Sequence, residues 1–267
     1  MESKSEMQSR IDEGNQLFWN ELCGSTMAIK LGITDHSAES LRRFDDAYMA
    51  LYPYLLARVP VEKFKGLRVL DIGLGYGTLG QKIAEYCSEY CGLDIAAGPV
   101  SMMNHRMAMM GIKGGATQGS MLECPFDDGG FDVVVSIGCF HHTGDLQRCI
   151  DETYRVLKPG GRAYVMVYNK FSYRNWMMWP FTTLKALMSS AKESGTSSQR
   201  GAYDADSQGR AAPETVFSSV AELQDMFGKF SSFDARKENW GGRMVRSLLL
   251  NNIAHLGGLD IYVCAQK

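Results

Sequence analysis

The 267-residue chain lacks several features that would place it in a protein class at once. Its first fifteen residues are polar and contain no apolar signal core, and no apolar run approaches the length of a membrane span. Its seven cysteines include no C-x-x-C pair, which favours free or buried thiols in a reducing compartment. The sequence therefore predicts a cytoplasmic protein without a transmembrane segment.

A strong net charge is missing as well. The formal charge is −2 and the pI is about 6.2, so the chain has no broad electrostatic attraction to a phosphate backbone. We therefore expect no nucleic-acid partner. The hydrophobic content of 45% is ordinary for a globular protein, and the length suits one α/β domain with additions.

The pattern of apolar residues divides the chain near residue 67. Residues 1–66 are expected to form a helical cap, because apolar residues recur at three-to-four spacing from Phe44 to Leu55. Residues 67–267 alternate short β-rich runs with helix-length segments, which is typical of a parallel sheet wrapped by helices. Seven strands are expected at Arg68–Ile72, Tyr90–Asp94, Gly115–Gly119, Phe131–Ile137, Arg162–Tyr168, Ser232–Lys237 and Leu259–Ala265.

Two lid-like insertions are expected in this domain, at about residues 171–217 and 240–258. The first lies between strands five and six, opens with aromatic residues and continues as a polar, Gly/Ser-rich tract. Loops of this length inside a compact domain are usually lids, binding elements or disordered segments. Its apolar cluster around Trp176 predicts, in order of preference, a hydrophobic lid, a dimer contact or a membrane-surface helix.

A glycine-rich turn follows the first expected strand. Gly73, Gly75 and Gly77 allow a tight turn and a close approach of backbone amides to a nucleotide-like ligand at a helix N-terminus. The spacing of Gly75, Gly77 and Gly80, with Asp94 after them, also fits a dinucleotide fingerprint. The turn alone therefore leaves open an NAD(P)-dependent oxidoreductase and a purely structural turn.

An acidic residue close to the glycines favours a different ligand. Asp71 lies at the end of the strand with one residue between it and Gly73, and an acidic group there suits a ligand with a cationic amino group, whereas it would repel a pyrophosphate. S-adenosylmethionine carries such an amino group. The sequence thus favours S-adenosylmethionine over a dinucleotide.

Four successive segments carry a family resemblance. VLDIGLGYGTLG, GLDIA, PFDDGGFDVVVSIGCFHHTGD and YRVLKPGGRAYVMVYN resemble, in order and spacing, the motifs of class I S-adenosylmethionine-dependent methyltransferases, particularly the ubiquinone/menaquinone-biosynthesis type. The resemblance covers roughly residues 67–170. It implies a Rossmann-like, seven-stranded, mostly parallel sheet with helices on both faces, to which this chain adds an N-terminal helical cap and an insertion between strands five and six.

The resemblance also implies roles for single residues. Gly73, Gly75 and Gly77 would line the methionine and ribose parts of the cofactor, with Asp71 near its amino group. Asp94 would accept hydrogen bonds from both ribose hydroxyls.

The other implied contacts surround the adenine and the methionine. Ile95 would lie beside the adenine, and Ser120 and Met121 would lie near the adenine amino group. Ser120 departs from the acidic residue usual at this position. Ile137 and Gly138 would lie beside the methionine moiety.

Two adjacent histidines follow the fourth strand, at the edge where open α/β sheets bind ligands. An imidazole can act as a general base, and we expect His142 in that role, with His141 as the second candidate. The alternative is that one histidine packs and the other bonds to loop backbone, because methyl transfer from a sulfonium can proceed by positioning alone. Cys139 and Asp145 lie nearby, but the adjacent histidines diverge and no second ligand cluster accompanies them, so no metal site is expected.

The methyl acceptor is expected to contact the cap, the end of the fifth strand and the first insertion. The candidates are Tyr48, Tyr52, Tyr168, Asn169 and Trp176, although Tyr48 and Tyr52 also fit a packing role on an amphipathic helix. The resulting hypothesis is methyl transfer to a small, apolar or aromatic metabolite by in-line displacement. The alternatives are the oxidoreductase and a non-catalytic S-adenosylmethionine-binding module, and the sequence does not indicate an oligomeric state.

Overall fold

The computed structural model describes residues 3–20, 26–112, 114–188, 194–240 and 257–267. Seven strands form one sheet in the order β3-β2-β1-β4-β5-β7-β6. Strands β1 to β5 pair in parallel, and β7 runs antiparallel to β5 and β6. The strands are β1 (Arg68–Ile72), β2 (Glu89–Asp94), β3 (Gly114–Gln118), β4 (Phe131–Ile137), β5 (Leu157–Tyr168), β6 (Ser232–Glu238) and β7 (Asp260–Gln266). The predicted fold, a mostly parallel seven-stranded sheet, is confirmed.

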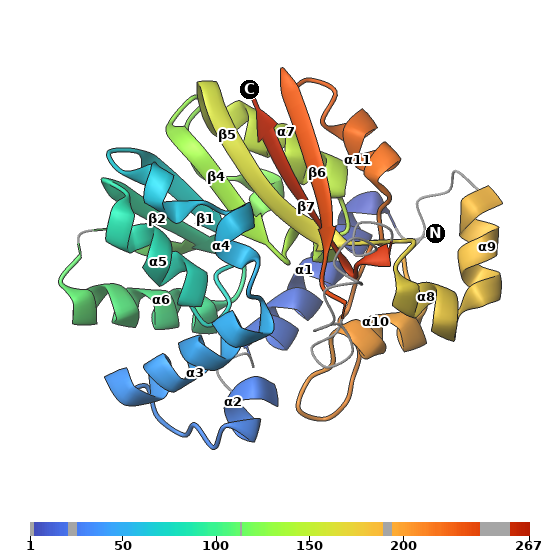
Figure 1. Cartoon of the computed structure of the whole chain (residues 1–267), viewed down its shortest axis with the longest axis horizontal. Coiled ribbons are helices and arrows are strands. Elements are labelled where there is room, and N and C mark those ends of the chain that lie inside the picture. The colour runs from blue at the N-terminus through green and yellow to red at the C-terminus, as the bar shows by residue number, and fades with distance from the viewer. Residues whose placement is uncertain (1–2, 21–25, 113, 189–193, 241–256) are drawn as a thin grey trace.

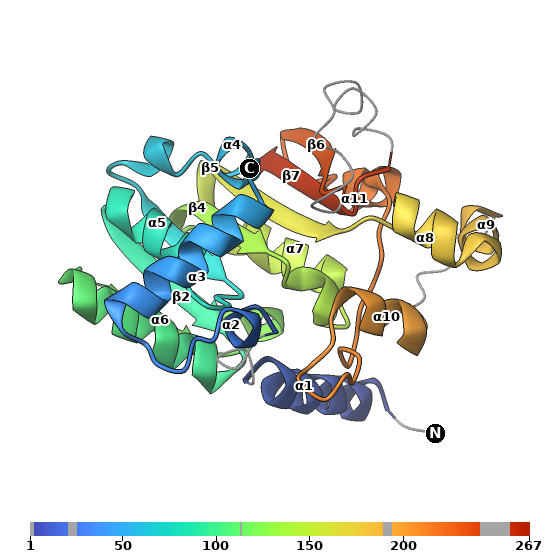
Figure 2. The same ribbon diagram turned by 60° about the horizontal axis from the view of Figure 1, so that its bottom comes forward.

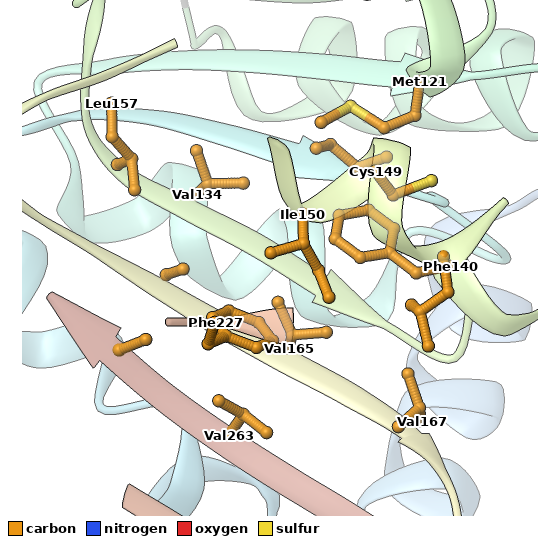
Figure 3. Packing of buried hydrophobic residues seen from close by; sticks show 14 of the residues in the cluster. Met121, Val134, Phe140, Cys149, Ile150, Leu157, Val165, Val167, Phe227 and Val263 are labelled. Carbon is orange, nitrogen blue, oxygen red and sulfur yellow. The ribbon is translucent and has the colours of Figure 1, made fainter. Parts of the chain in front are cut away.

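Helices cover both faces of this sheet (Figure 1). The central strands β1 and β4 are mostly apolar and mostly buried, because helices cover them on both sides. One face packs Val134, Val165 and Val263 against α7 and α11 (Figure 3). The other packs Val133 and Val135 against α5, α6 and the short helix α4 (Leu55–Arg58). The helices of the domain are α5 (Thr78–Tyr86), α6 (Ala97–Met110), η3 (Met121–Glu123), η4 (Phe140–His142), α7 (Leu146–Val156), α8 (Tyr173–Met178), α9 (Pro180–Met188), α10 (Ser197–Tyr203) and α11 (Val220–Met226).

Residues before β1 are mainly helical, as expected for a cap. They form α1 (Lys4–Asn20), α2 (Thr26–Lys30), α3 (Ala38–Leu51), α4 (Leu55–Arg58) and η2 (Val61–Phe64). A buried ion pair fastens α3 to the domain: the Arg106 guanidinium donates to both carboxylate oxygens of Asp45 at 2.8 and 2.9 Å, and its side chain is fully buried. This bidentate geometry fixes the cap over α5 and α6.

The predicted start of the fifth strand is wrong. The sequence predicts that this strand begins at Arg162, but β5 begins at Leu157 and includes residues 158–161. The register jumps from Phe131–Leu157 to Val133–Arg162, so these residues form a bulge within the strand. The Gly160 amide donates to the Lys267 carbonyl oxygen at 3.1 Å, which keeps this bulge in contact with the end of β7.

The elements added to the sheet lie in two places. In both views α1, α3 and α10 lie near the ends of the parallel strands, whereas α8 and α9 stand away from the sheet (Figure 1, Figure 2). Of the helices in the first insertion, α10 thus lies near the strand ends, and α8 and α9 lie farther from the sheet. The second predicted insertion, at 240–258, lies mostly outside the described residues.

Candidate functional site

A cavity of about 730 Å³ opens at the carboxyl ends of the parallel strands. This is the edge at which open α/β sheets bind ligands, and the volume is in the range of small-molecule sites. The predicted residues that line the cavity are Tyr48, Tyr52, Gly73, Gly75, Asp94, Ile95, Ser120, Met121, Ile137, Gly138, His142 and Tyr168. We call the part between Gly73 and Gly138 the glycine-loop half, and the part formed by Trp19, Tyr48, Tyr52, His142, Tyr168, Tyr203 and Asp204 the aromatic half.

The glycine-rich turn needs glycine for two reasons. Gly73 has a φ of 78°, and a Cβ at this position would lie 2.3 Å from the Cys139 Cβ, so the loop passes too close to the end of β4 for any side chain. Gly75 has a φ of 52° and lines the cavity, and a Cβ there would meet no atom within 4 Å. Both positions expose backbone where a ligand can approach it.

Asp94, at the end of β2, is held by backbone amides. Its Oδ2 accepts from the Leu74 amide and its Oδ1 accepts from the Ala96 amide, both at 2.8 Å. Burial raises the pKa of Asp94 to about 6, and these backbone hydrogen bonds oppose the rise. Asp94 also lines the cavity, and a carboxylate oxygen that accepts one hydrogen bond can accept another.

The loops after β3 and β4 complete the glycine-loop half. Ser120 caps η3, where its Oγ accepts from the Leu122 amide at 3.2 Å. Gln118 fixes the turn that carries Ile95, because its amide donates to the Ile95 carbonyl oxygen at 3.0 Å. Met121 is buried in the apolar core (Figure 3). It also lines the cavity.

Two predicted cofactor residues lie behind the loop and do not line the cavity. Asp71 is 4% exposed, and its Oδ2 accepts a hydrogen bond from the Tyr90 hydroxyl at 2.9 Å. Burial raises its pKa to about 7. Gly77 precedes α5 and faces Arg106, whose Cδ would lie 2.8 Å from a Cβ at that position. The repulsion of a pyrophosphate expected from Asp71 therefore does not operate at the cavity surface.

The two adjacent histidines have different surroundings. His142 lines the cavity, whereas His141 is fully buried and outside the lining. The His141 ring packs 4.2 Å from the Tyr168 ring, and neither of its nitrogens has a hydrogen-bond partner among the described residues. Burial lowers the pKa of His141 well below its ordinary value. The surroundings of His141 are therefore those of a packed side chain. This is the alternative to a catalytic role that the sequence left open for one of the two histidines.

His142 is fixed by segments from both ends of the chain. Its Nδ1 lies 2.7 Å from the Glu214 carbonyl oxygen. Its ring packs 4.8 Å from the Trp19 ring, and its own carbonyl oxygen accepts from the Asn15 side chain at 2.7 Å. Its Nε2 lies 3.5 Å from Asp204 Oδ2. Burial lowers the pKa of His142, and the Asp204 carboxylate opposes this change.

Tyrosines from the cap and from β5 form much of the aromatic half. The Tyr48 and Tyr52 rings are 4.9 Å apart on one side, and the Tyr168 and Tyr203 rings are 4.7 Å apart on the other. Burial raises the pKa of each of these phenols, so they remain protonated at neutral pH. The cavity therefore offers aromatic faces and neutral hydroxyls in this half.

The remaining predicted substrate residues do not reach the cavity. Asn169 is fully buried and fastens the chain segments around the insertion, since its side chain donates to the Gly258 carbonyl oxygen at 2.7 Å. Trp176 is 39% exposed on α8. The inner side of this helix is occupied by the polar Asn175, which holds α8 to the Lys170 carbonyl oxygen at 3.1 Å. The apolar residues of α8 and α9 consequently face outward and do not cover the cavity.

A different part of the insertion covers it. Residues 201–207 line the cavity and include Tyr203 and Asp204, which were not predicted as site residues. They lie in the polar tract after the aromatic cluster. The sequence marked this tract as a loop, but gave no sign that it contacts His142.

The charges on the cavity lining favour a cation. Asp12, Asp94, Asp204 and Asp206 contribute carboxylates, and Lys30 is the lysine on the described lining. Arg210 pairs with Asp206, which leaves more carboxylates than cations around the cavity. A bound pyrophosphate would be repelled by this arrangement.

No group of three or more His, Cys, Asp or Glu side chains among the described residues has the geometry to hold a metal ion. No helix in this part of the chain has both the length and the apolar character needed to cross a membrane.

Comparison with known sequences agrees with the motifs. Residues 69–161 match the family described as a methyltransferase domain. A demethylmenaquinone methyltransferase of Thermus thermophilus is 31% identical over 38% of this chain, and a ubiquinone/menaquinone-biosynthesis C-methyltransferase of Vibrio vulnificus is 34% identical over 39% of it. A sterol 4-C-methyltransferase of Caenorhabditis elegans is 29% identical over 46%. These matches cover 47%, 42% and 37% of the three relatives, so the chain spans less than half the length of the curated proteins that it matches.

Comparison with solved structures extends the likeness to most of the chain. An S-adenosylmethionine-dependent methyltransferase from Mesorhizobium loti superposes with a TM-score of 0.55 at 15% identity, over 82% of this chain and 98% of that protein. The YcgJ protein of Bacillus subtilis gives 0.54 at 19% identity over 82% and 98%. At these identities the structures show a shared fold. The sequence match thus shows that residues 69–161 are similar to a methyltransferase domain, and the superpositions show that the chain shares the fold of an S-adenosylmethionine-dependent methyltransferase.

Proposed function

We propose that this protein transfers the methyl group of S-adenosylmethionine to a small, apolar or aromatic molecule. The observation that carries the proposal is the sharing of one cavity by the glycine-loop half and the aromatic half. A methyl donor in the first half and an acceptor in the second would lie next to one another. Exclusion of water and alignment of the two reactants are the main requirements of this reaction.

The glycine-loop half fits the cofactor. Asp94 would accept hydrogen bonds from the two ribose hydroxyls, because the residue lines the cavity and each of its oxygens is positioned by a backbone amide. Gly73 and Gly75 keep side chains away from the path of the cofactor. Ile95, Ser120 and Met121 would surround the adenine. The bound cofactor supplies a methyl group on a positively charged sulfur.

The charge of the cavity supports this cofactor over a dinucleotide. The surplus of carboxylates on the lining attracts a sulfonium and an ammonium group and repels a pyrophosphate. This support comes from the cavity as a whole and not from Asp71, which is buried behind the loop. An NAD(P)-dependent oxidoreductase is accordingly not favoured.

The aromatic half supports an apolar or aromatic acceptor. Aromatic rings of the cap and of β5 bury flat apolar surface effectively. The names of the curated relatives include quinone-biosynthesis and sterol methyltransferases. We propose that the acceptor of this chain is likewise an apolar molecule with a ring system. Residues 201–207 act as the lid that closes over it.

Titration calorimetry with three ligands tests the cofactor. We expect binding of S-adenosylmethionine and S-adenosylhomocysteine and no binding of NAD. Binding of NAD alone would overturn the proposal. Formation of S-adenosylhomocysteine in the presence of a library of phenols, quinols and sterols then separates an enzyme from a non-catalytic binding module.

A further inference from the structure

The outward side of α8 and α9 is an exposed apolar surface, which we call the α8–α9 face. Met177 and Phe181 are 76% and 86% exposed. The other exposed apolar members of the face are Trp176, Met178, Leu184, Leu187 and Met188. Single exposed apolar residues are ordinary, but a group of this size on two adjacent helices marks an interaction surface. Both helices stand away from the sheet (Figure 1, Figure 2), so the sheet domain does not cover the face.

The buried residue of each helix is polar. In α8 it is Asn175, whose side-chain amide donates to the Lys170 carbonyl oxygen at 3.1 Å. In α9 it is Thr183, whose hydroxyl lies 3.0 and 2.9 Å from the carbonyl oxygens of Asn175 and Trp179. A helix at a water-facing surface shows the reverse, with apolar side chains inward and polar ones in solvent. This inverted polarity favours an apolar medium as the neighbour of the α8–α9 face.

The two helices carry only positive charges. Between residues 173 and 188 the chain has Arg174 and Lys185 and no acidic residue. Lys185 is exposed, and it lies on the same side of α9 as Phe181 and Met188, which are four and three residues away from it. A lysine within an apolar surface suits the boundary of a bilayer, because its stem is apolar and its ammonium group reaches the headgroups. The charge of the face therefore complements an anionic lipid surface.

We propose that the α8–α9 face docks on an anionic phospholipid surface. Its apolar side chains enter the boundary between headgroups and acyl chains, and Lys185 meets the lipid phosphates. With six and nine residues, α8 and α9 are each too short to cross a bilayer, so the contact is peripheral. The docking goes beyond the proposed methyltransferase function and does not depend on it.

A second copy of the chain fits this face less well than a bilayer does. In a symmetric dimer the same patch meets itself. The exposed Lys185 of each protomer would then face helices that carry Arg174 and Lys185 and no carboxylate. Like charges across an interface oppose association, whereas an anionic bilayer supplies the opposite charge. The charge of the face thus favours lipid over a second copy.

The helix α8 is joined to residues 201–207, which cover the cavity. The Tyr203 hydroxyl lies 2.7 Å from Ser172 Oγ, at the start of α8. Arg174 donates to the Ala202 carbonyl oxygen at 3.0 Å, and its guanidinium lies 4.6 Å from the centre of the Tyr203 ring. Docking would therefore hold this cover near the lipid, and an apolar acceptor would enter the cavity from the membrane. This consequence, unlike the docking itself, rests on the proposed function.

Vesicle co-sedimentation of the full chain, without cofactor, tests the apolar part of the docking. We expect the wild type to bind vesicles of phosphatidylglycerol and phosphatidylcholine, and Phe181→Asp to bind them about 30-fold less tightly or worse, because an inserted aromatic ring is replaced by a charge. Leu17→Asp on α1 makes the same kind of change at a residue that is 79% exposed, and it should bind as the wild type does. No vesicle binding by the wild type, or equal losses in the two variants, would overturn the proposal.

Vesicles of phosphatidylcholine alone test the charge. The wild type should bind them at least about fivefold less tightly than the anionic vesicles, since one basic residue near an anionic surface contributes about that much. Lys185→Glu should lose about tenfold or more in binding to anionic vesicles and less than about threefold with neutral ones. Lys63→Glu, an exposed position on η2, makes the same change in net charge and is the matched control. Equal losses in both charge variants, or equal wild-type binding to both vesicles, would contradict the anionic surface.

Sedimentation velocity and calorimetry on the same proteins separate the other outcomes. A wild-type dimer that Phe181→Asp dissociates would assign the face to a second copy and refute the docking. S-adenosylmethionine should bind equally to the wild type and to Phe181→Asp, because Phe181 lies outside the described lining of the cavity. Vesicle binding by a wild type that does not bind S-adenosylmethionine would leave the docking intact and refute the proposed function. Cofactor binding without vesicle binding would refute the docking alone.

Discussion

The two halves of the cavity are assembled from different parts of the chain. The glycine-loop half comes from loops that directly follow β1, β2, β3 and β4, so neighbouring strands of one sheet position it. The aromatic half joins Trp19, near the start of the chain, to Asp204, in the insertion after β5, around a histidine from η4. Its geometry depends on long-range packing of added segments. The first half is thus a property of the sheet, and the second is a property of what surrounds the sheet.

The way each half is held follows from this difference. Asp94 receives its hydrogen bonds from the backbone of its own turn and of the adjacent loop. His142 is held by the Asn15 side chain, by the Glu214 carbonyl oxygen and by the stacked Trp19 ring. A substitution in the glycine-loop half should therefore act locally, whereas one that loosens the cap or the insertion should alter the aromatic half. The following predictions test this separation.

The largest effect is expected from the two adjacent histidines. His142→Gln should lower turnover by about 100-fold or more and leave the affinity for S-adenosylmethionine nearly unchanged, because general-base catalysis contributes about that much. His141→Phe should keep turnover within about tenfold, because His141 lies outside the cavity and packs on the Tyr168 ring. Steady-state kinetics with calorimetry checks both variants. Equal losses in the two variants would mean that the pair acts by packing alone.

The second effect concerns the attachment of the cap. In Asp45→Asn the fully buried Arg106 guanidinium loses its paired carboxylate. Breaking a buried ion pair from one side costs about 3 kcal/mol or more of unfolding free energy. Denaturant unfolding measures this loss, and Asp46→Asn, which alters an exposed pair on the same helix, is the control. A loss below about 1 kcal/mol would show that the ion pair does not fasten the cap.

The third effect is confined to the glycine-loop half. Asp94→Ala removes two charge-assisted hydrogen bonds to the ribose and should weaken S-adenosylmethionine binding by about 100-fold. The titration midpoint of His142 should not move, because Asp94 is not among the groups that shift it. Calorimetry and the histidine resonances measure the two quantities on one sample. Unchanged affinity would refute the role of Asp94.

The sheet could be predicted from the sequence, because apolar runs of strand length report burial on both faces. Strands β1 and β4 begin and end at the predicted residues, and the other strands differ at their ends. The bulge at residues 158–161 could not be predicted, because Pro159 and two glycines equally indicate a turn. The bulge forms because this segment pairs with β4 and contacts the end of β7. Neither long-range interaction can be inferred from the local sequence.

The same limit applies to the site. The motifs predicted most of the residues in the glycine-loop half, since strand ends and their loops are local features. The motif placed Asp71 near the ligand, but the Tyr90 hydroxyl and burial hold its side chain behind the loop. Asp204 could not be predicted, because its meeting with His142 depends on how the insertion folds back. The apolar neighbours of Trp176 predict contact with the acceptor, yet polar Asn175 occupies the inner side of its helix.

The smallest effect is a pH dependence that again separates the two halves. Burial raises the pKa of Asp94 to about 6 from an ordinary value of 3.8, so the free protein binds a proton there as the pH falls below about 6. The ribose hydroxyls need the ionised carboxylate, and this proton must leave when the cofactor binds. The affinity for S-adenosylmethionine should therefore fall as the pH drops from about 6 to about 4, by at most about tenfold per pH unit. Asp94→Asn has no carboxyl to titrate, so its weaker affinity should stay level over the same range. Calorimetry across this range measures both proteins. Equal pH dependence in both would assign the titration to another group, with buried Asp71 as the next candidate.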